Sequence, residues 1–230
     1  MSEANRLERQ HWLKNAGYRY SGFISWPRRP IGTDNTKVRR LVEKLQKGVQ
    51  DVAPLHGLPP AVFLDSEAID PGEDWHRRIA TAICGTISFI AVCGPEYYES
   101  IFCGREWAGM EQLSLRRLAG QRIAILPLVW QPARSQGATG LLQDEAMPPQ
   151  VSRLQHRDFS RLRLHRPDVE ETDEFNDFVQ EIVSRIDHAA TALLDQGAHA
   201  EDCDHFEIPA ESAFRDFTQA AQRYPLTREK

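Results

Sequence analysis

The chain lacks a strong excess of charge of either sign. Its 230 residues carry 28 Lys and Arg against 33 Asp and Glu, which gives a net charge of −5 with neutral His. A balance of this kind attracts neither nucleic acid nor an anionic membrane surface. Generic nucleic-acid binding is therefore disfavoured.

Long hydrophobic runs are also missing. No apolar stretch approaches the roughly 18 residues that a membrane helix needs, and Arg6, Glu8, Arg9 and Lys14 interrupt any signal-peptide core in the first twenty residues. Hydrophobic residues still make up 41% of the chain, which is enough for a core. We therefore expect a cytoplasmic protein with no membrane partner.

Cysteine is scarce and irregularly spaced. The four are Cys84, Cys93, Cys103 and Cys203. Their spacing gives no disulfide framework, so reduced thiols are expected. His199, Cys203 and His205 could be drawn as a metal cluster, but they lack a fourth ligand at a sensible spacing and lie among acidic residues. A solvated tail is the better interpretation, and no metal site is expected.

Two nucleotide-binding signatures do not occur. The chain has neither a Gly-x-Gly-x-x-Gly dinucleotide loop nor a Gly-x-x-x-x-Gly-Lys phosphate loop, so a dehydrogenase or an NTPase is not supported. A phosphoacceptor response regulator needs paired acids after its first strand, and Trp26-Pro27-Arg28-Arg29 stands there instead.

What the chain does contain is an alternation of short apolar runs with segments of helical period. The apolar runs predict strands at residues 20–26, 61–64, 88–93 and 123–130, with a small last strand near 154–159. The segments between them predict helices, including one over residues 100–118 and one that begins near Thr172. Strands that alternate with helices need crossovers, so a parallel sheet with helices on both faces is expected.

The length favours one α/β domain with terminal additions. We place the domain at residues 18–196, an N-terminal extension at 1–17 and an acidic C-terminal tail at 197–230. Phe214, Phe217, Ala221 and Tyr224 have helical spacing and predict a short helix in this tail. We expect the tail to dock on a partner, to dock on the domain itself, or to lead into a sensor protein or C-terminal domain.

A candidate functional segment follows the third predicted strand. Residues 100–111 open a helix after a Gly94-Pro95 break, and Glu106 stands four residues beyond Phe102 on the same helix face, near the edge of the sheet. A carboxylate there can face a ligand. The alternative is an ordinary solvated carboxylate on a helix surface.

Three boxes in this order resemble a Toll/interleukin-receptor (TIR) domain of the bacterial type. They are Phe23-Ile24-Ser25-Trp26, Val62-Phe63-Leu64-Asp65 with the following loop through Trp75, and residues 100–106. The resemblance covers about residues 18–194. It implies a flavodoxin-like sheet of five parallel strands. It also implies one of two functions, which are cleavage of NAD between nicotinamide and ribose, or assembly without catalysis.

In the enzymatic class the essential residue is a glutamate on the third helix, preceded four positions earlier by a large residue. The matching positions are Glu106 and Phe102. Nicotinamide leaves as a neutral molecule from a cationic pyridinium, so one carboxylate suffices where glycosidases use two. Glu106 would hold the ribose hydroxyls and stabilise the oxocarbenium-like sugar.

Neighbouring residues are expected to bind the rest of the substrate. Trp26 and Phe102 would stack on nicotinamide or adenine, and Arg28 and Arg29 would bind the pyrophosphate. Trp75 is a further candidate contact, although a structural role in its helix is the stronger expectation. The alternatives are core or rim aromatics and a solvated basic loop.

The acidic loop before Trp75 corresponds to the BB loop, the segment through which family members contact the next protomer. Its residues here are Asp70, Pro71, Gly72 and Glu73. The leading hypothesis is an NAD-consuming enzyme of bacterial antiphage defence, with NAD as substrate, no cofactor and self-association through this loop. One alternative is a non-enzymatic TIR–TIR scaffold. A less favoured one is a nucleotide-sugar or nucleoside-processing enzyme that uses Glu106 on another N-glycosidic bond.

Overall fold

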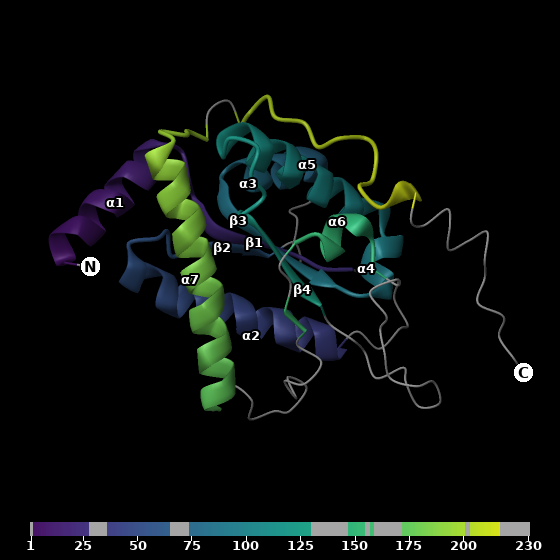
Figure 1. Cartoon of the computed structure of the whole chain (residues 1–230), viewed down its shortest axis with the longest axis horizontal. Helices are drawn as coiled ribbons and strands as arrows, with labels where there is room; N and C mark the ends of the chain where they lie inside the picture. The colour runs from purple at the N-terminus through teal and green to yellow at the C-terminus, as the bar shows by residue number, and fades with distance from the viewer. Residues whose placement is uncertain are drawn as a thin grey trace, which may run out of the picture.

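The computed structural model of the chain describes residues 2–27, 36–64, 74–129, 147–154, 157–158, 172–200 and 203–216. In these residues five parallel strands form one sheet in the order β2-β1-β3-β4-β5 (Figure 1). The strands are β1 (Tyr20–Ser25), β2 (Val62–Leu64), β3 (Thr86–Cys93), β4 (Ile125–Val129) and β5 (Arg157–Asp158). This is the order of flavodoxin-like folds, so the predicted fold class is confirmed.

Helices cover both faces of the sheet. They are α1 (Glu3–Asn15), α2 (Thr36–Val52), the 3-10 helix η1 (Ala53–His56), α3 (Trp75–Cys84), α4 (Pro95–Glu99), α5 (Ile101–Arg117), α6 (Pro149–Ser152) and α7 (Asp173–Asp195). On one side α2 packs against α7, and on the other α3 packs against α5 (Figure 1). The sequence pattern did not predict α4, a single short turn that precedes α5.

Aromatic rings form a row across the sheet beneath α3 and α5. Parallel register places Phe23 beside both Phe63 and Phe89, and its ring stacks on theirs at 5.1 and 5.6 Å. Trp107 from α5 meets Phe89 edge-on at 6.4 Å. The fully buried Trp107 thereby anchors the middle of α5 to the central strand.

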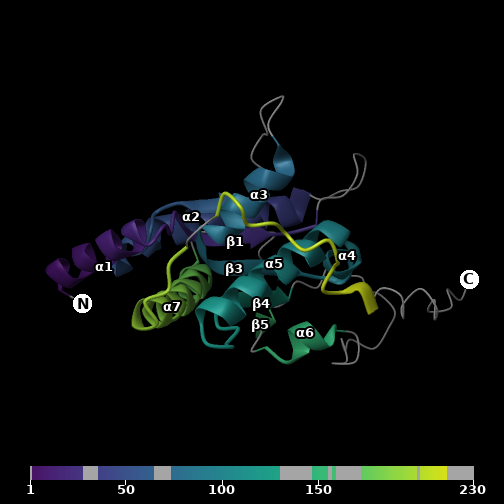
Figure 2. The same cartoon turned by 90° about the horizontal axis from the view of Figure 1, so that it is seen from above.

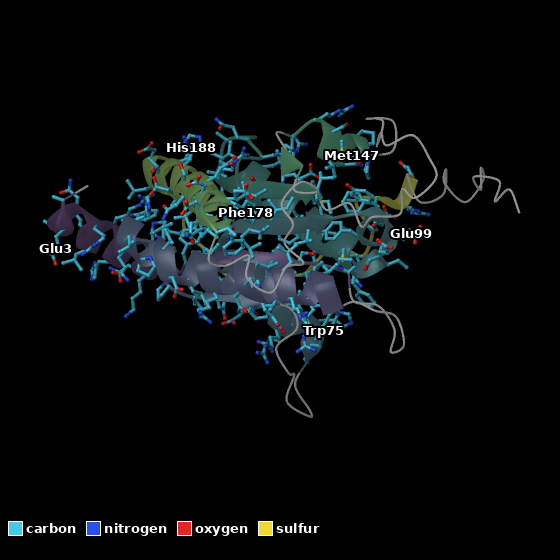
Figure 3. All side chains as sticks on the ribbon, turned by 90° about the horizontal axis from the view of Figure 1, so that it is seen from below. Glu3, Trp75, Glu99, Met147, Phe178 and His188 are labelled. Carbon is cyan, nitrogen blue, oxygen red and sulfur yellow. A yellow bond between two sulfur atoms is a disulfide. The ribbon has the colours of Figure 1, made fainter. Side chains whose placement is uncertain are left out.

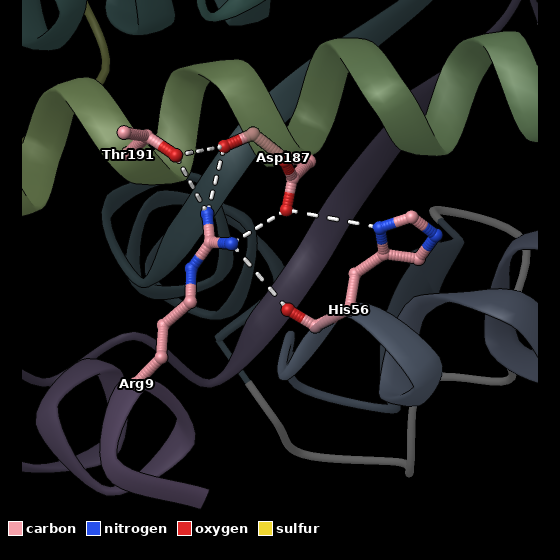
Figure 4. A network of polar contacts seen from close by, with 4 residues as sticks. All are labelled: Arg9, His56, Asp187 and Thr191. Atoms are coloured by element: carbon pink, nitrogen blue, oxygen red, sulfur yellow. Dashed lines mark hydrogen bonds and ion pairs between the residues drawn. The ribbon is translucent and has the colours of Figure 1, made fainter. Parts of the chain in front are cut away.

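The N-terminal helix α1 packs on the domain through the buried Leu13, and the guanidinium group of Arg9 adds a set of polar contacts (Figure 4). Arg9 donates to the Asp187 carboxylate at 2.5 Å, to the Asp187 carbonyl at 2.7 Å, to Thr191 at 3.1 Å and to the His56 carbonyl at 3.4 Å. The residues predicted as an N-terminal extension therefore include a helix tied to both α7 and η1. None of the helices in the described part of the chain combines the length and hydrophobicity that a bilayer span requires.

Residues 203–216, named here the strap, cross the outer surface of α3 and α5 (yellow in Figures 1 and 2). A disulfide joins Cys203 at the start of the strap to Cys84 at the end of α3. The expectation of reduced thiols is therefore wrong for this pair, whereas Cys93 and Cys103 are free and buried. The two partners are 119 residues apart in sequence, and only the return of the chain over α3 brings their Cα atoms within 5.4 Å.

Candidate functional site

Glu106 lies on the inner side of α5, one turn beyond the start of the helix. The helix begins after Ser100, whose hydroxyl accepts a hydrogen bond from the Cys103 N–H at 3.3 Å. The Glu106 side chain is only 3% exposed, and its Oε2 accepts a hydrogen bond from the Ser25 hydroxyl at 2.5 Å. The carboxylate is therefore not a solvated surface group.

A second hydroxyl extends this contact. Tyr97 on α4 is fully buried and donates to the Ser25 Oγ at 3.0 Å. Burial raises the pKa of Tyr97 well above its usual value, and the nearby Cys103, Cys93 and Glu106 raise it further. Tyr97 is therefore a protonated donor at neutral pH, and the contacts run in one direction from Tyr97 through Ser25 to Glu106.

These groups meet at the point where the strand order of the sheet reverses. Ser25 is the last residue of β1 and pairs with Ala91 of the neighbouring strand β3. From β1 the chain continues to β2 on one side of it, while β3 lies on the other side. Ligands of open α/β sheets bind outside the carboxyl ends of the strands at such a switch point. Glu106 is therefore placed at the characteristic ligand position of this fold.

Phe102 lies one helical turn before Glu106, at the start of α5. Its ring is 53% exposed and meets the half-buried Trp75 edge-on at 5.3 Å. Trp75 begins α3 near the outer edge of the molecule (Figure 3). The structure thus brings two of the predicted binding aromatics together. The backbone of Glu106 lies about 6 Å further along the helix axis than that of Phe102, which is the rise of four helical residues.

Trp26 follows Ser25 and is 6% exposed, packed in the core cluster. Within the described residues its indole N–H has no hydrogen-bond partner. This burial favours the core-aromatic interpretation, and stacking of Trp26 on a ligand stays a prediction. Arg28, Arg29 and the BB-loop residues 70–73 lie outside the described residues, so their roles also stay predictions.

A cavity of about 580 Å³ lies between the first turns of α3, Arg105 of α5 and the start of the strap. Its lining mixes the cations of Arg77 and Arg105 with the anions of Asp204 and Glu207, and Glu106 is not among its described lining residues. The cavity is therefore distinct from the carboxylate site. Among the described residues no group of three or more His, Cys, Asp or Glu side chains is placed to hold a metal ion.

Ser25 and Tyr97 are the site residues that sequence reasoning missed. Ser25 stood in the first quoted box without a role, and Tyr97 belongs to the unpredicted helix α4. The only signal in the sequence was the position of Ser25 at the predicted end of a strand.

The chain matches a known protein family. The family model described as TIR domain matches residues 23–174. The match includes Ser25, Tyr97 and Glu106 and ends before the strap. A comparison with curated proteins gives no match.

Proposed function

Because the chain belongs to the TIR-domain family, we propose that it is an NAD-consuming enzyme that cleaves the bond between nicotinamide and ribose. The observation that carries this proposal is the buried Glu106 carboxylate at the β1/β3 switch point, held by the Ser25 hydroxyl at 2.5 Å. The family also contains members that only assemble, and an oriented buried carboxylate favours the enzymatic class.

The proposed reaction needs only one carboxylate, because nicotinamide leaves as a neutral molecule and requires no general acid. The C1′–N bond breaks, its electron pair stays on the pyridine nitrogen, and neutral nicotinamide leaves. The ribose then carries the positive charge, which the Glu106 carboxylate stabilises. Water adds at C1′ and loses a proton to give ADP-ribose, or an internal nucleophile adds to give a cyclic product. A buried charge acts more strongly here than a solvated one because the local dielectric constant is lower.

The other residues have supporting roles in this proposal. Ser25 orients the carboxylate, and Tyr97 holds Ser25. Phe102 at the rim stacks on an aromatic ring of NAD, while Arg28 and Arg29 bind its pyrophosphate. Self-association through residues 70–73 completes the site, and the setting is bacterial antiphage defence in the cytoplasm.

The test is nicotinamide release from NAD by the full chain at high concentration with a crowding agent. Glu106→Gln should lower the rate by about two to three orders of magnitude, roughly 3 to 4 kcal/mol, as loss of an electrostatic stabiliser does. Glu111→Gln is the matched control, because Glu111 lies on the same helix but pairs with Arg122 at 2.5 Å. Equal release by wild type and Glu106→Gln would defeat the catalytic assignment.

Two further outcomes separate the alternatives. No release by the assembled wild type, together with self-association that Asp70→Ala abolishes, would favour the scaffold. Faster cleavage of nucleosides than of NAD in a substrate panel would favour a nucleoside-processing enzyme.

A further inference from the structure

The strap lies outside the family match, yet it contacts the helical turn that carries Glu106. It runs along α5 in the direction opposite to the helix chain, so that residues 206–209 lie beside Gly109 and Ser212 lies beside Gly104. The Ala213 N–H donates to the Gly104 carbonyl at 3.0 Å, and the Arg105 Nε donates to the Pro209 carbonyl at 2.9 Å. The two residues directly before Glu106 are thus bound from outside the helix.

Phe214 of the strap fills an aromatic pocket next to the carboxylate site. It is fully buried, with its ring 5.9 Å from that of Tyr97, 5.5 Å from Tyr98 and 5.4 Å from Trp107. Tyr97 is the residue that donates to Ser25, and Trp107 directly follows Glu106. Phe214 therefore packs both on Tyr97, which donates to Ser25, and on Trp107, which is the next residue after Glu106.

We infer that the strap is a positioning element for Glu106 and that Phe214 is a positioning residue. This inference rests on the proposed function. Phe214 keeps the Tyr97 ring in place, so that the Tyr97 hydroxyl stays on Ser25 and Ser25 stays on the carboxylate. The contact at Gly104 fixes the helical turn itself, so the strap acts on Glu106 by two routes.

One glycine of α5 allows the strap to be displaced without a cavity, and a second glycine of the same helix provides a control. A β-carbon at position 104 would collide with the Ser212 Oγ and lie 2.8 Å from the Ser212 Cβ, so Gly104→Ala pushes the strap outward. At position 109 it would meet Phe206 and Pro209 at 3.5 Å, which is ordinary contact. Gly109→Ala is therefore the matched control on the same helix. Phe214→Leu tests the other route, in which Phe214 packs on Tyr97.

The measurements are kcat and KM for nicotinamide release, and the side-chain carboxyl ¹³C resonance of Glu106, assigned with Glu106→Gln. Gly104→Ala and Phe214→Leu should lower kcat by about 10- to 100-fold with KM little changed, as misplacement of a catalytic group does. Both should also shift the Glu106 resonance. Gly109→Ala should leave kcat, KM and the resonance as in wild type.

The resonance separates this inference from the proposed reaction. If the Glu106 resonance moves in both Gly104→Ala and Phe214→Leu while wild type releases no nicotinamide, the positioning role stands and the proposed reaction fails. If it is the same in all four proteins, or if kcat of the strap variants equals or exceeds that of wild type, the positioning role is overturned.

Discussion

The hydroxyl oxygen of Ser25 lies 2.5 Å from Oε2 of Glu106, although the two residues are 81 positions apart in sequence. A short hydrogen bond from a hydroxyl to a carboxylate is charge-assisted and stronger than one between neutral groups. It also fixes the direction of the carboxylate. Ser25 therefore holds Glu106 in the orientation that the proposed chemistry needs.

Ser25→Ala should weaken both catalysis and stability. The buried carboxylate loses a donor, which costs about 1 to 3 kcal/mol of unfolding free energy. The carboxylate also loses the group that orients it, so kcat should fall by about 10- to 100-fold with KM little changed. Urea unfolding and steady-state kinetics of nicotinamide release measure the two effects.

Ser21→Ala is the matched control for this variant. Ser21 lies on the same strand, is equally buried, and donates to the Ala61 carbonyl at 3.2 Å. It should lose stability and keep the wild-type kcat. An equal loss of kcat in both variants would contradict a specific role for Ser25.

Tyr97→Phe should have a smaller effect of the same kind. The variant keeps the ring that packs on Phe214 and removes only the hydroxyl that donates to Ser25 at 3.0 Å. Because the Tyr97 hydroxyl acts through Ser25, the losses in kcat of Tyr97→Phe and Ser25→Ala should not add in the double variant. Tyr98→Phe, the same change at the next residue, should leave kcat unchanged. Additive losses would mean that the two hydroxyls act independently.

The sequence predicted the parts of the site that depend on local pattern. The helical period predicts a helix over residues 100–118 with Phe102 and Glu106 four residues apart on it, and the structure has α5 at Ile101–Arg117. The Ser25–Glu106 bond depends on how a helix sits on a strand in three dimensions. A serine at the end of an apolar run does not reveal its partner, so this contact could not be predicted.

The sequence predicted docking of the tail on the domain only as one of several alternatives, and it did not predict the path or the contacts of the strap. Its acidic composition is typical of a solvated tail, and the pattern shows the buried Phe214 only as one of four residues at helical spacing. The Cys84–Cys203 pair spans most of the domain, so no local spacing indicates it. Long-range contacts of this kind leave little trace in a single sequence.

Removal of the disulfide should destabilise the protein. Cys203→Ser opens a loop with a sequence separation of 119, and loss of such a bond lowers the unfolding free energy by about 2 to 5 kcal/mol. A dithiol reductant should lower the stability of wild type to that of the variant. The same reductant should leave Cys203→Ser unchanged, because Cys93 and Cys103 are free thiols already. Equal urea midpoints for oxidised wild type and Cys203→Ser would contradict a stabilising bond.

The buried Tyr18 should make stability fall at alkaline pH. Its hydroxyl donates to the Ala198 carbonyl at 3.0 Å, and burial raises its pKa to about 12, against a smaller lowering by Arg117. In the unfolded chain it ionises near pH 10. The raised pKa therefore contributes stability that is fully present below about pH 10 and is lost as the pH rises to about 12, at most about 3 kcal/mol. Urea unfolding across this range should show a shallower decline for Tyr18→Phe than for wild type, and identical slopes would show that Tyr18 ionises alike in both states.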